Sequence, residues 1–223
     1  MSANMNYKNR FKIGTPVEFG FRQVLLINLF SFMPQLIAGA LFGGGAVGIV
    51  GVIILGACCG LPYWFVVIPL CCFVLSLSMC YFVPYLMFAN YYIRRMTSIR
   101  QPIDGAINYV CQVTTRPRTC VGLRAFLEDA DDIGVLSIHA DRIEFRGDHM
   151  EFTIVPNGDT SVTLCNIGWR GFWFAGRRIR IVLNSHEEIP DMDVAERQSS
   201  TVPQSRKIAL QIFEAIENAK RET

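Results

Sequence analysis

The sequence predicts an α+β membrane protein, in which a two-span transmembrane helical hairpin precedes an antiparallel β-barrel or sandwich with a C-terminal helix. Three observations predict this fold class. No Asp, Glu, Lys, Arg or His occurs from Gln23 to Ile93. Apolar and polar residues then alternate between Ile133 and Leu183, which is typical of half-buried strands. Finally, residues 205–221 have the periodicity of an amphipathic helix.

The uncharged segment is too long for one membrane crossing and suits two. A helix crosses the hydrocarbon core with roughly 20 apolar residues. Gly56, Gly60 and Pro62 interrupt a helix near the middle of the segment, so we expect the turn between the spans there. A three-span alternative adds a break at residues 43–45, where three glycines follow one another.

Basic residues flank the uncharged segment on both sides and predict an even number of crossings. They are Lys8, Arg10, Lys12 and Arg22 before the segment, and Arg94, Arg95 and Arg100 after it. Such flanks lie in the cytoplasm under the positive-inside rule. We therefore expect a multi-pass protein of the cell membrane with both termini in the cytoplasm and the lipid bilayer as a partner. The uncharged segment holds no carboxylate, histidine or basic side chain, which argues against transport by this chain alone.

These boundaries divide the chain into four parts. They are a cytoplasmic N-terminal segment (1–22), a transmembrane helical hairpin (23–95), a juxtamembrane connector (96–132) and a soluble domain (133–223). In the connector, Ile103, Ile107 and Val110 have the spacing of one helical face and predict a short helix.

Glycines in the first half of the uncharged segment predict close helix packing. Gly39 and Gly43, and then Gly44 and Gly48, stand four residues apart. This spacing lets two helix backbones approach closely in lipid. It favours packing within the hairpin, and a homo-oligomer interface stays open as the second interpretation.

Cysteine and histidine residues do not form a metal-binding pattern. None of the eight cysteines belongs to a Cys-x-x-Cys pair, and the three histidines have no matching spacing to them. We therefore expect neither a metal nor a cofactor. The net charge of +2 also argues against a nucleic-acid partner.

The soluble domain is expected to contain antiparallel strands joined by short turns. The strands lie around residues 136–139, 142–146, 149–154, 162–164, 172–174 and 178–183. Gly147 and Asp148 have the length of a two-residue hairpin turn, and residues 156–159 form the next turn. A polar stretch, residues 184–204, then leads to the amphipathic helix, whose apolar face should pack against the sheet.

A strongly bent antiparallel sheet closed by a C-terminal helix resembles the pleckstrin-homology-like and GRAM-like domains, over residues 133–221. The resemblance is carried by residues 134–138, 141–148, 152–156 and 176–181. It implies a non-enzymatic interaction or scaffold module at the membrane, which presents its surface to lipid headgroups or to a protein partner. An accessory subunit of a membrane transport complex is an alternative.

Two groups of residues are candidates for binding. Arg177, Arg178 and Arg180 form a basic edge, and Trp169 with Arg170 adds an aromatic side chain beside a cation. Together they could bind anionic lipid headgroups. The other interpretation is that the arginines belong to a solvated strand face.

A second class of function rests on a looser pattern. Arg142 and Arg146, followed by residues 166–171, resemble the two-part signature of cyclic-dinucleotide-binding PilZ barrels. An enzyme is not expected, because the soluble part has no nucleophile elbow, phosphate-binding glycine loop or paired metal ligands.

Overall fold

The computed structural model describes most of the chain. The described residues are 9–15, 20–60, 65, 67–81, 86–97, 103–115, 130–165, 178–184 and 191–222. The helices are α1 (Phe21–Cys59), α2 (Val67–Tyr81), α3 (Leu86–Thr97) and α5 (Val202–Glu222). The strands are β1 (Arg10–Ile13), β2 (Ile107–Thr114), β3 (Asp132–Ile138), β4 (Ile143–Gly147), β5 (Met150–Ile154), β6 (Thr160–Cys165), β7 (Arg178–Leu183) and β8 (Met192–Glu196).

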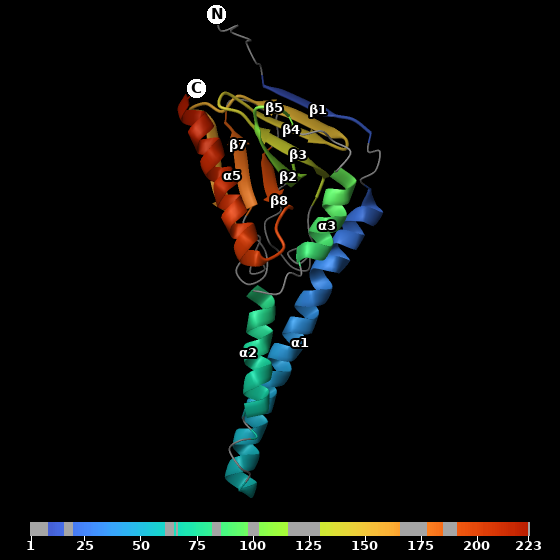
Figure 1. Ribbon diagram of the computed structural model, residues 1–223, viewed down its shortest axis with the longest axis vertical. Coiled ribbons are helices and arrows are strands. Elements are labelled where there is room, and N and C mark those ends of the chain that lie inside the picture. The colour runs from blue at the N-terminus through green and yellow to red at the C-terminus, as the bar shows by residue number, and fades with distance from the viewer. Residues whose placement is uncertain are drawn as a thin grey trace, which may run out of the picture.

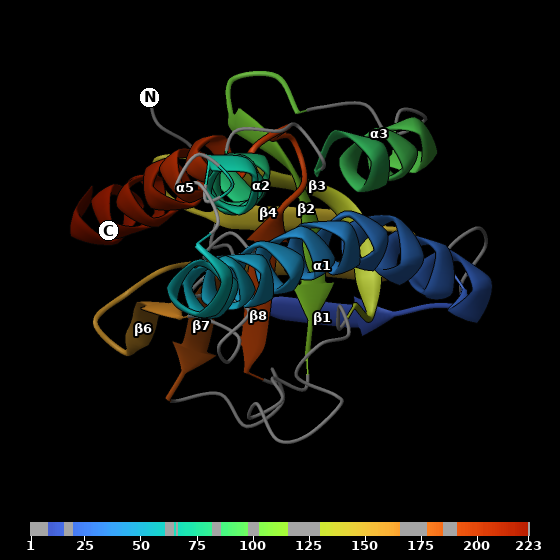
Figure 2. The same ribbon diagram turned by 90° about the horizontal axis from the view of Figure 1, so that it is seen from below.

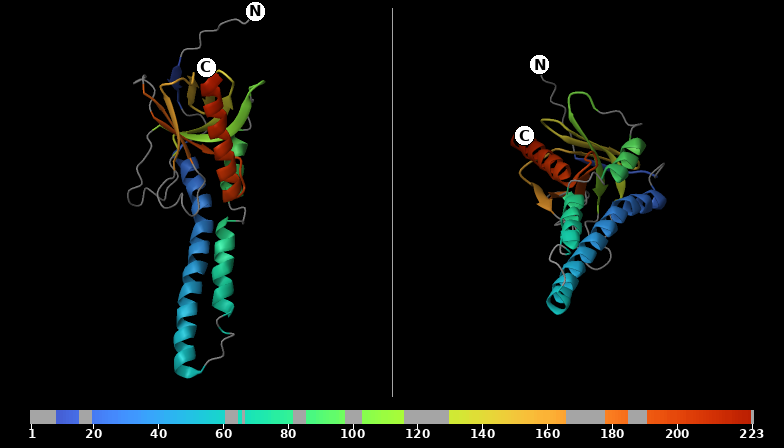
Figure 3. Two further views of the ribbon diagram at one scale, coloured as in Figure 1. Left: turned by 90° about the vertical axis from the view of Figure 1, so that its left-hand side faces the viewer. Right: turned by 60° about the horizontal axis from the view of Figure 1, so that its bottom comes forward.

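The strands form one eight-stranded sheet in the order β1-β5-β4-β3-β2-β8-β7-β6. All neighbouring strands are antiparallel. The sheet curls around α5, and the hairpin of α1 and α2 extends away from it (Figures 1 and 3). The antiparallel sheet and the C-terminal helix predicted from the alternation and the helical periodicity are confirmed.

The main core lies between α5 and the concave face of the sheet. Alternate residues of β4 and β5 point into it, and the rings of Phe145 and Phe152 stack with centroids 5.1 Å apart. From α5, Ala209, Ile212 and Ile216 enter the same core and are fully buried. Apolar side chains at these spacings explain why α5 is helical and why it packs on this face.

The opposite face of the sheet is covered in its middle by α3 and the first turns of α1. Ile27 of α1, Ala89 and Ile93 of α3 and Ile133 of β3 form a second buried cluster. Figure 2 shows α3 and α1 on this side of the strands. A buried polar contact fixes α3 in place, because the Asn90 side-chain amide donates a hydrogen bond of 2.6 Å to the carbonyl of Ser199.

β3 is tied to the β4–β5 turn by one buried carboxylate, that of Asp132. Asp132 accepts hydrogen bonds of 2.7–3.0 Å from the backbone N–H groups of Ile133, Asp148, His149 and Met150. The residue is fully buried. A Cβ at Gly147 would lie 1.9 Å from Asp132 Oδ2, so only glycine fits beside this carboxylate.

The prediction of a two-span membrane protein is contradicted. In the described part of the chain, no helix combines the length and hydropathy that a membrane crossing needs. α2 and α3 are shorter than the roughly 20 residues of a crossing. This finding corrects the transmembrane hairpin, in both its two-span and its three-span forms, and the multi-pass location in the cell membrane.

The helical hairpin itself is present. α1 continues through residues 43–45 and ends at Cys59, where Gly60 adopts a left-handed conformation with φ 66°. The predicted turn around Gly60 is therefore confirmed, and the alternative break at 43–45 is absent. Apolar side chains are exposed along both helices, among them Val47, Ile53, Ile68 and Val74.

Three strands lie outside the predicted set. β1 comes from the N-terminal segment, β2 from the connector and β8 from the polar stretch. The helix predicted from Ile103, Ile107 and Val110 is wrong, because Ile103 precedes the strand β2 and Ile107 and Val110 belong to it. Tyr109 faces the main core, whereas Val110 packs in the second cluster. The strand predicted at residues 172–174 lies outside the described residues.

Replacing Asp132 by Ala should strongly destabilise the sheet. Four backbone donors, two of them in buried hydrogen bonds, would lose this acceptor, which we expect to cost about 3 kcal/mol or more. Denaturant unfolding of the full chain measures this loss. Asp141→Ala is the matched control, because the Asp141 side chain is 53% exposed. Equal stabilities of the two variants would contradict the role assigned to Asp132.

Alanine substitutions at two adjacent glycines should have opposite effects on the hairpin. Alanine favours a helix over glycine by about 1 kcal/mol at either position. A Cβ at Gly44 meets no atom within 4 Å, whereas a Cβ at Gly45 would lie 3.0 Å from the Pro69 carbonyl oxygen and the Phe73 nitrogen of α2. Gly44→Ala should therefore raise the thermal stability of the helices, measured by circular dichroism, and Gly45→Ala should lower it. Similar shifts for both would show that α1 and α2 do not pack at Gly45.

Candidate functional site

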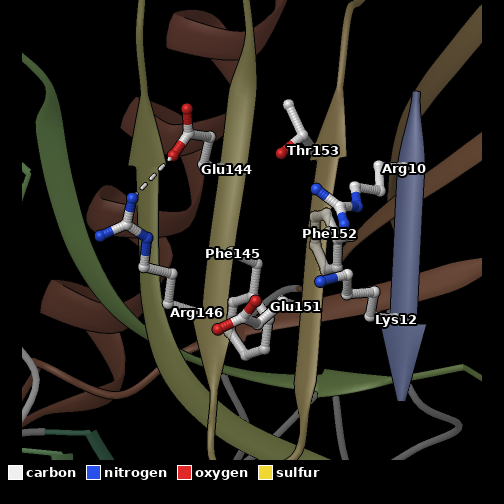
Figure 4. A pocket seen from close by; sticks show the side chains of 8 residues that line it. All are labelled: Arg10, Lys12, Glu144, Phe145, Arg146, Glu151, Phe152 and Thr153. Carbon is white, nitrogen blue, oxygen red and sulfur yellow. Dashed lines mark hydrogen bonds and ion pairs between the residues drawn. The ribbon is translucent and has the colours of Figure 1, made fainter. Parts of the chain in front are cut away.

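A charged hollow lies on the outer face of β1, β5 and β4, where neither α3 nor α1 covers the sheet. It has a volume of about 130 Å³ and is lined by Arg10, Lys12, Glu144, Phe145, Arg146, Glu151, Phe152 and Thr153. Figure 4 shows its charged side chains side by side on the three strands. The polar residues occupy the positions that alternate with the core residues of the same strands, so they point away from the core.

The register places the charged residues in two rows across the strands. Lys12 pairs with Glu151, which pairs with Arg146 on its other side. Arg10 pairs with Thr153 in the neighbouring row. Neighbouring strands lie about 4.8 Å apart, so one carboxylate of β5 stands between two cations. The hollow thus contains three cations and two carboxylates.

The carboxylate of Glu144 is already neutralised. Its Oε1 accepts a hydrogen bond of 2.6 Å from Arg142 Nε, and its Oε2 lies 3.4 Å from Arg146 Nη2. By contrast, Arg10 and Lys12 form no ion pair with any described residue, and both are exposed. Their positive charges are therefore available to an anionic group that approaches the outer face.

Two of the three arginines predicted as a basic edge have hydrogen-bond partners on other strands of the sheet. Arg178 is buried, and its Nη1 donates a hydrogen bond of 3.4 Å to Thr114. Arg180 donates hydrogen bonds of 2.8 and 3.1 Å to the carboxylate of Asp193. These hydrogen bonds raise the pKa of Arg180. Arg177, Trp169 and Arg170, the other residues of this predicted site, lie outside the described residues.

The predicted glycine positions fall on different sides of α1. A Cβ at Gly48 would lie 2.9 Å from the Pro69 side chain of α2. Gly43 and Gly44 face open space, with no atom within 4 Å of a Cβ built on them. Gly39 belongs to α1, but its surroundings are not among those the structure describes.

The cysteines and histidines of the described residues are likewise not assembled for metal binding. Within the described residues, no three His, Cys, Asp or Glu side chains could together hold a metal ion. Burial, and then the Glu196 carboxylate, raise the pKa of the Cys111 thiol well above its ordinary value. The pKa of Cys165 is also raised, first by burial and then by Asp193. Both thiols are therefore held in the protonated form, which is the unreactive one.

The sequence alone did not point to this hollow. The alternation of Glu144 and Arg146 with apolar residues was visible, and it identified the solvent side of β4 correctly. Arg10 and Lys12 were recognised only as basic residues before a helix. Their pairing with β5 joins residues far apart in the chain, and a four-residue strand has no recognisable periodicity of its own.

The stability of the domain should depend on the protonation of His139, in the turn before β4. Burial, and then Arg142, lower the pKa of this histidine, and its Nε2 is buried without a hydrogen-bond partner. The unfolded chain therefore binds a proton more readily than the folded one. Stability is present above the ordinary pKa of about 6.5 and is lost as the pH falls through it. His139→Gln should reduce the loss in free energy of unfolding between about pH 7 and pH 5, and an unchanged pH dependence would contradict this role.

Comparison with known protein families, with curated proteins and with solved structures finds no match to this chain.

Proposed function

We propose that the chain is a non-enzymatic interaction module that binds an acidic segment of a partner protein at the charged hollow. The observation that carries the proposal is the pair Arg10 and Lys12, two exposed cations on one face of β1 without an ion-pair partner among the described residues. Arg146 lies across the hollow from them. A carboxylate placed here gains charge-assisted hydrogen bonds, which are stronger than neutral ones.

The fold supports a module of the pleckstrin-homology-like kind. Strands β2–β5 form one antiparallel meander, β6–β8 form a second, and the pairing of β2 with β8 joins them into one curled sheet. α5 packs in the concave side of that sheet. This arrangement has the features on which the resemblance rests, a strongly bent sheet and a C-terminal helix.

The state of the carboxylates favours binding over catalysis. Glu144 is held by Arg142, and Asp193 is held by Arg180. Asp132 accepts four backbone hydrogen bonds, and Glu196 accepts a hydrogen bond of 2.5 Å from the hydroxyl of Ser199. A general acid or base must lie within hydrogen-bond reach of the substrate atom that gains or loses a proton. These four carboxylates instead accept hydrogen bonds from other residues of the fold.

The size of the hollow favours a macromolecular partner over a small ligand. Small-molecule sites usually have volumes of roughly 300–1,000 Å³ and mostly apolar walls. This hollow measures about 130 Å³ and is lined by five charged side chains. It fits one or two side chains of a protein segment that lies across the outer face.

The cyclic-dinucleotide alternative gains no comparable support. Arg142 and Arg146 both contact Glu144. The second part of that signature, residues 166–171, lies outside the described residues. We therefore retain the protein-binding module as the proposed function.

The test is a charge reversal in the full chain. A fluorescent peptide rich in Glu and Val serves as the probe, and its anisotropy is measured at low and moderate salt. The double variant Arg10→Glu, Lys12→Glu should bind it at least ~10-fold more weakly, because two favourable charge pairs become unfavourable. Salt should weaken binding to the parent protein.

The matched control reverses two exposed cations of α5, Lys207→Glu and Arg221→Glu, and changes the net charge by the same amount. This control should bind the peptide like the parent protein. If both double variants lose binding equally, the net charge of the protein is responsible and the proposed site is wrong. The proposal also fails if the parent protein does not bind the peptide at low salt.

A further inference from the structure

The two edges of the described sheet differ in their exposure. β1 and β6 are the edge strands. α5 packs beside β6, and Lys220 Nζ donates a hydrogen bond of 2.7 Å to the carbonyl of Thr160, the first residue of β6. β1 has no described strand or helix on its outer side (Figure 1). An uncovered edge presents backbone donors and acceptors to another chain.

The register identifies the backbone groups of β1 that point outward. The N–H of Gly14 donates a hydrogen bond of 2.6 Å to the carbonyl of His149. In an antiparallel pair, residues that exchange hydrogen bonds alternate with residues that do not. Lys12 and Arg10 therefore share hydrogen bonds with β5, whereas the N–H and C=O groups of Phe11 and Ile13 face the free edge.

The side chains of β1 define what an added strand would have to contain. Arg10 and Lys12 face the charged hollow, whereas Phe11 packs partly against the main core on the other face. Ile13 lies on the same face as Phe11 and is 64% exposed. An extended segment beside β1 would therefore meet two cations on one face and apolar surface on the other.

We propose that the free edge of β1 binds an extended protein segment by antiparallel strand addition, and that this segment alternates acidic with apolar side chains. The inference rests on the proposed function, since it specifies how the acidic partner is held. Main-chain hydrogen bonds supply affinity in this mode of recognition, and alternate side chains supply specificity. The apolar residues pair with Phe11 and Ile13, so their N–H groups point toward β1. The acidic residues face Arg10 and Lys12.

Backbone methylation of the peptide tests this geometry on the unmodified full chain. The probe is a fluorescent peptide of alternating Glu and Val, together with two versions that carry N-methyl groups on every Val or on every Glu. Methylation of Val blocks the amides that face β1 and should weaken binding at least ~10-fold, as expected for the loss of two or more net hydrogen bonds. Methylation of Glu blocks amides that face solvent. It should leave the affinity within a factor of about 2 of that of the parent peptide, a change in binding free energy smaller than the net contribution of one hydrogen bond.

A scrambled peptide with the same Glu and Val content separates this inference from the proposed function. Strand addition requires the alternating peptide to bind at least ~5-fold more tightly than the scrambled one, about one net hydrogen bond. If both peptides bind equally and the Arg10→Glu, Lys12→Glu variant binds neither, strand addition is overturned. The proposed binding of an acidic segment at the hollow is then still supported. If neither peptide binds, both strand addition and the proposed acidic binding site are overturned.

A variant of the protein provides an independent check. Ile13→Pro removes an outward N–H that β5 does not use, whereas Ile13→Thr keeps that N–H and shortens the apolar side chain. The proline variant should lose the preference for the alternating over the scrambled peptide, and the threonine variant should keep it. Retention of the preference by the proline variant would overturn the assignment of the edge.

Discussion

The sheet depends on the acceptance of four backbone hydrogen bonds by the buried carboxylate of Asp132. This residue begins β3, and three of its four partners are consecutive residues, Asp148 and His149 of the turn after β4 and Met150 at the start of β5. A carboxylate offers about four lone-pair sites, so one side chain can accept all four hydrogen bonds. The turn held in this way aligns β4 with β5 and thereby places Phe145 on Phe152. The same alignment puts the charged residues of both strands on the opposite face, where the hollow forms.

The position of the hollow follows from how the two faces of the sheet are covered. α5 fills the concave face, and α3 with the start of α1 covers the middle of the other. The hydrogen bond from Asn90 to Ser199 connects α3 to the segment between β8 and α5. The helices on the two faces of the sheet are thus linked through one buried hydrogen bond. The strands at the β1 end extend past this cover. Their outer face is therefore free to carry charges, which would be too costly in the covered region without partners.

The alternation of apolar and polar residues is clearest in the strands that have one covered and one open face. β4 and β5 alternate cleanly because only one face needs apolar residues, and β3, β6, β7 and α5 were also located correctly. β2 was wrongly predicted as a helix because Ile103, Ile107 and Val110 have the spacing of one helical face, although apolar residues of this strand alternate with mostly polar ones. β8 was taken for a polar connection because Asp193 and Glu196 are buried, and only the folded chain shows that Arg180 and Ser199 are their partners. For the site, the alternation within single strands predicts which residues face outward. The pairing of β1 with β5, and the hydrogen bonds of Arg178 to Thr114 and of Arg180 to Asp193, depend on contacts between distant segments.

The pairing of β1 with β5 has a consequence for the order in which the protein can assemble during synthesis. Asn9, beside β1, accepts a hydrogen bond from Val155, which is 146 residues later in the chain. A ribosome therefore completes β1 and the whole helical hairpin before the strand that receives β1 exists. β2 is likewise synthesised before β8, the strand with which it pairs on one side. Contacts of such long range form slowly because the loop between them must first be closed. In the nascent chain, β1 is therefore made long before β5, and it can pair with the sheet only after β5 has been synthesised.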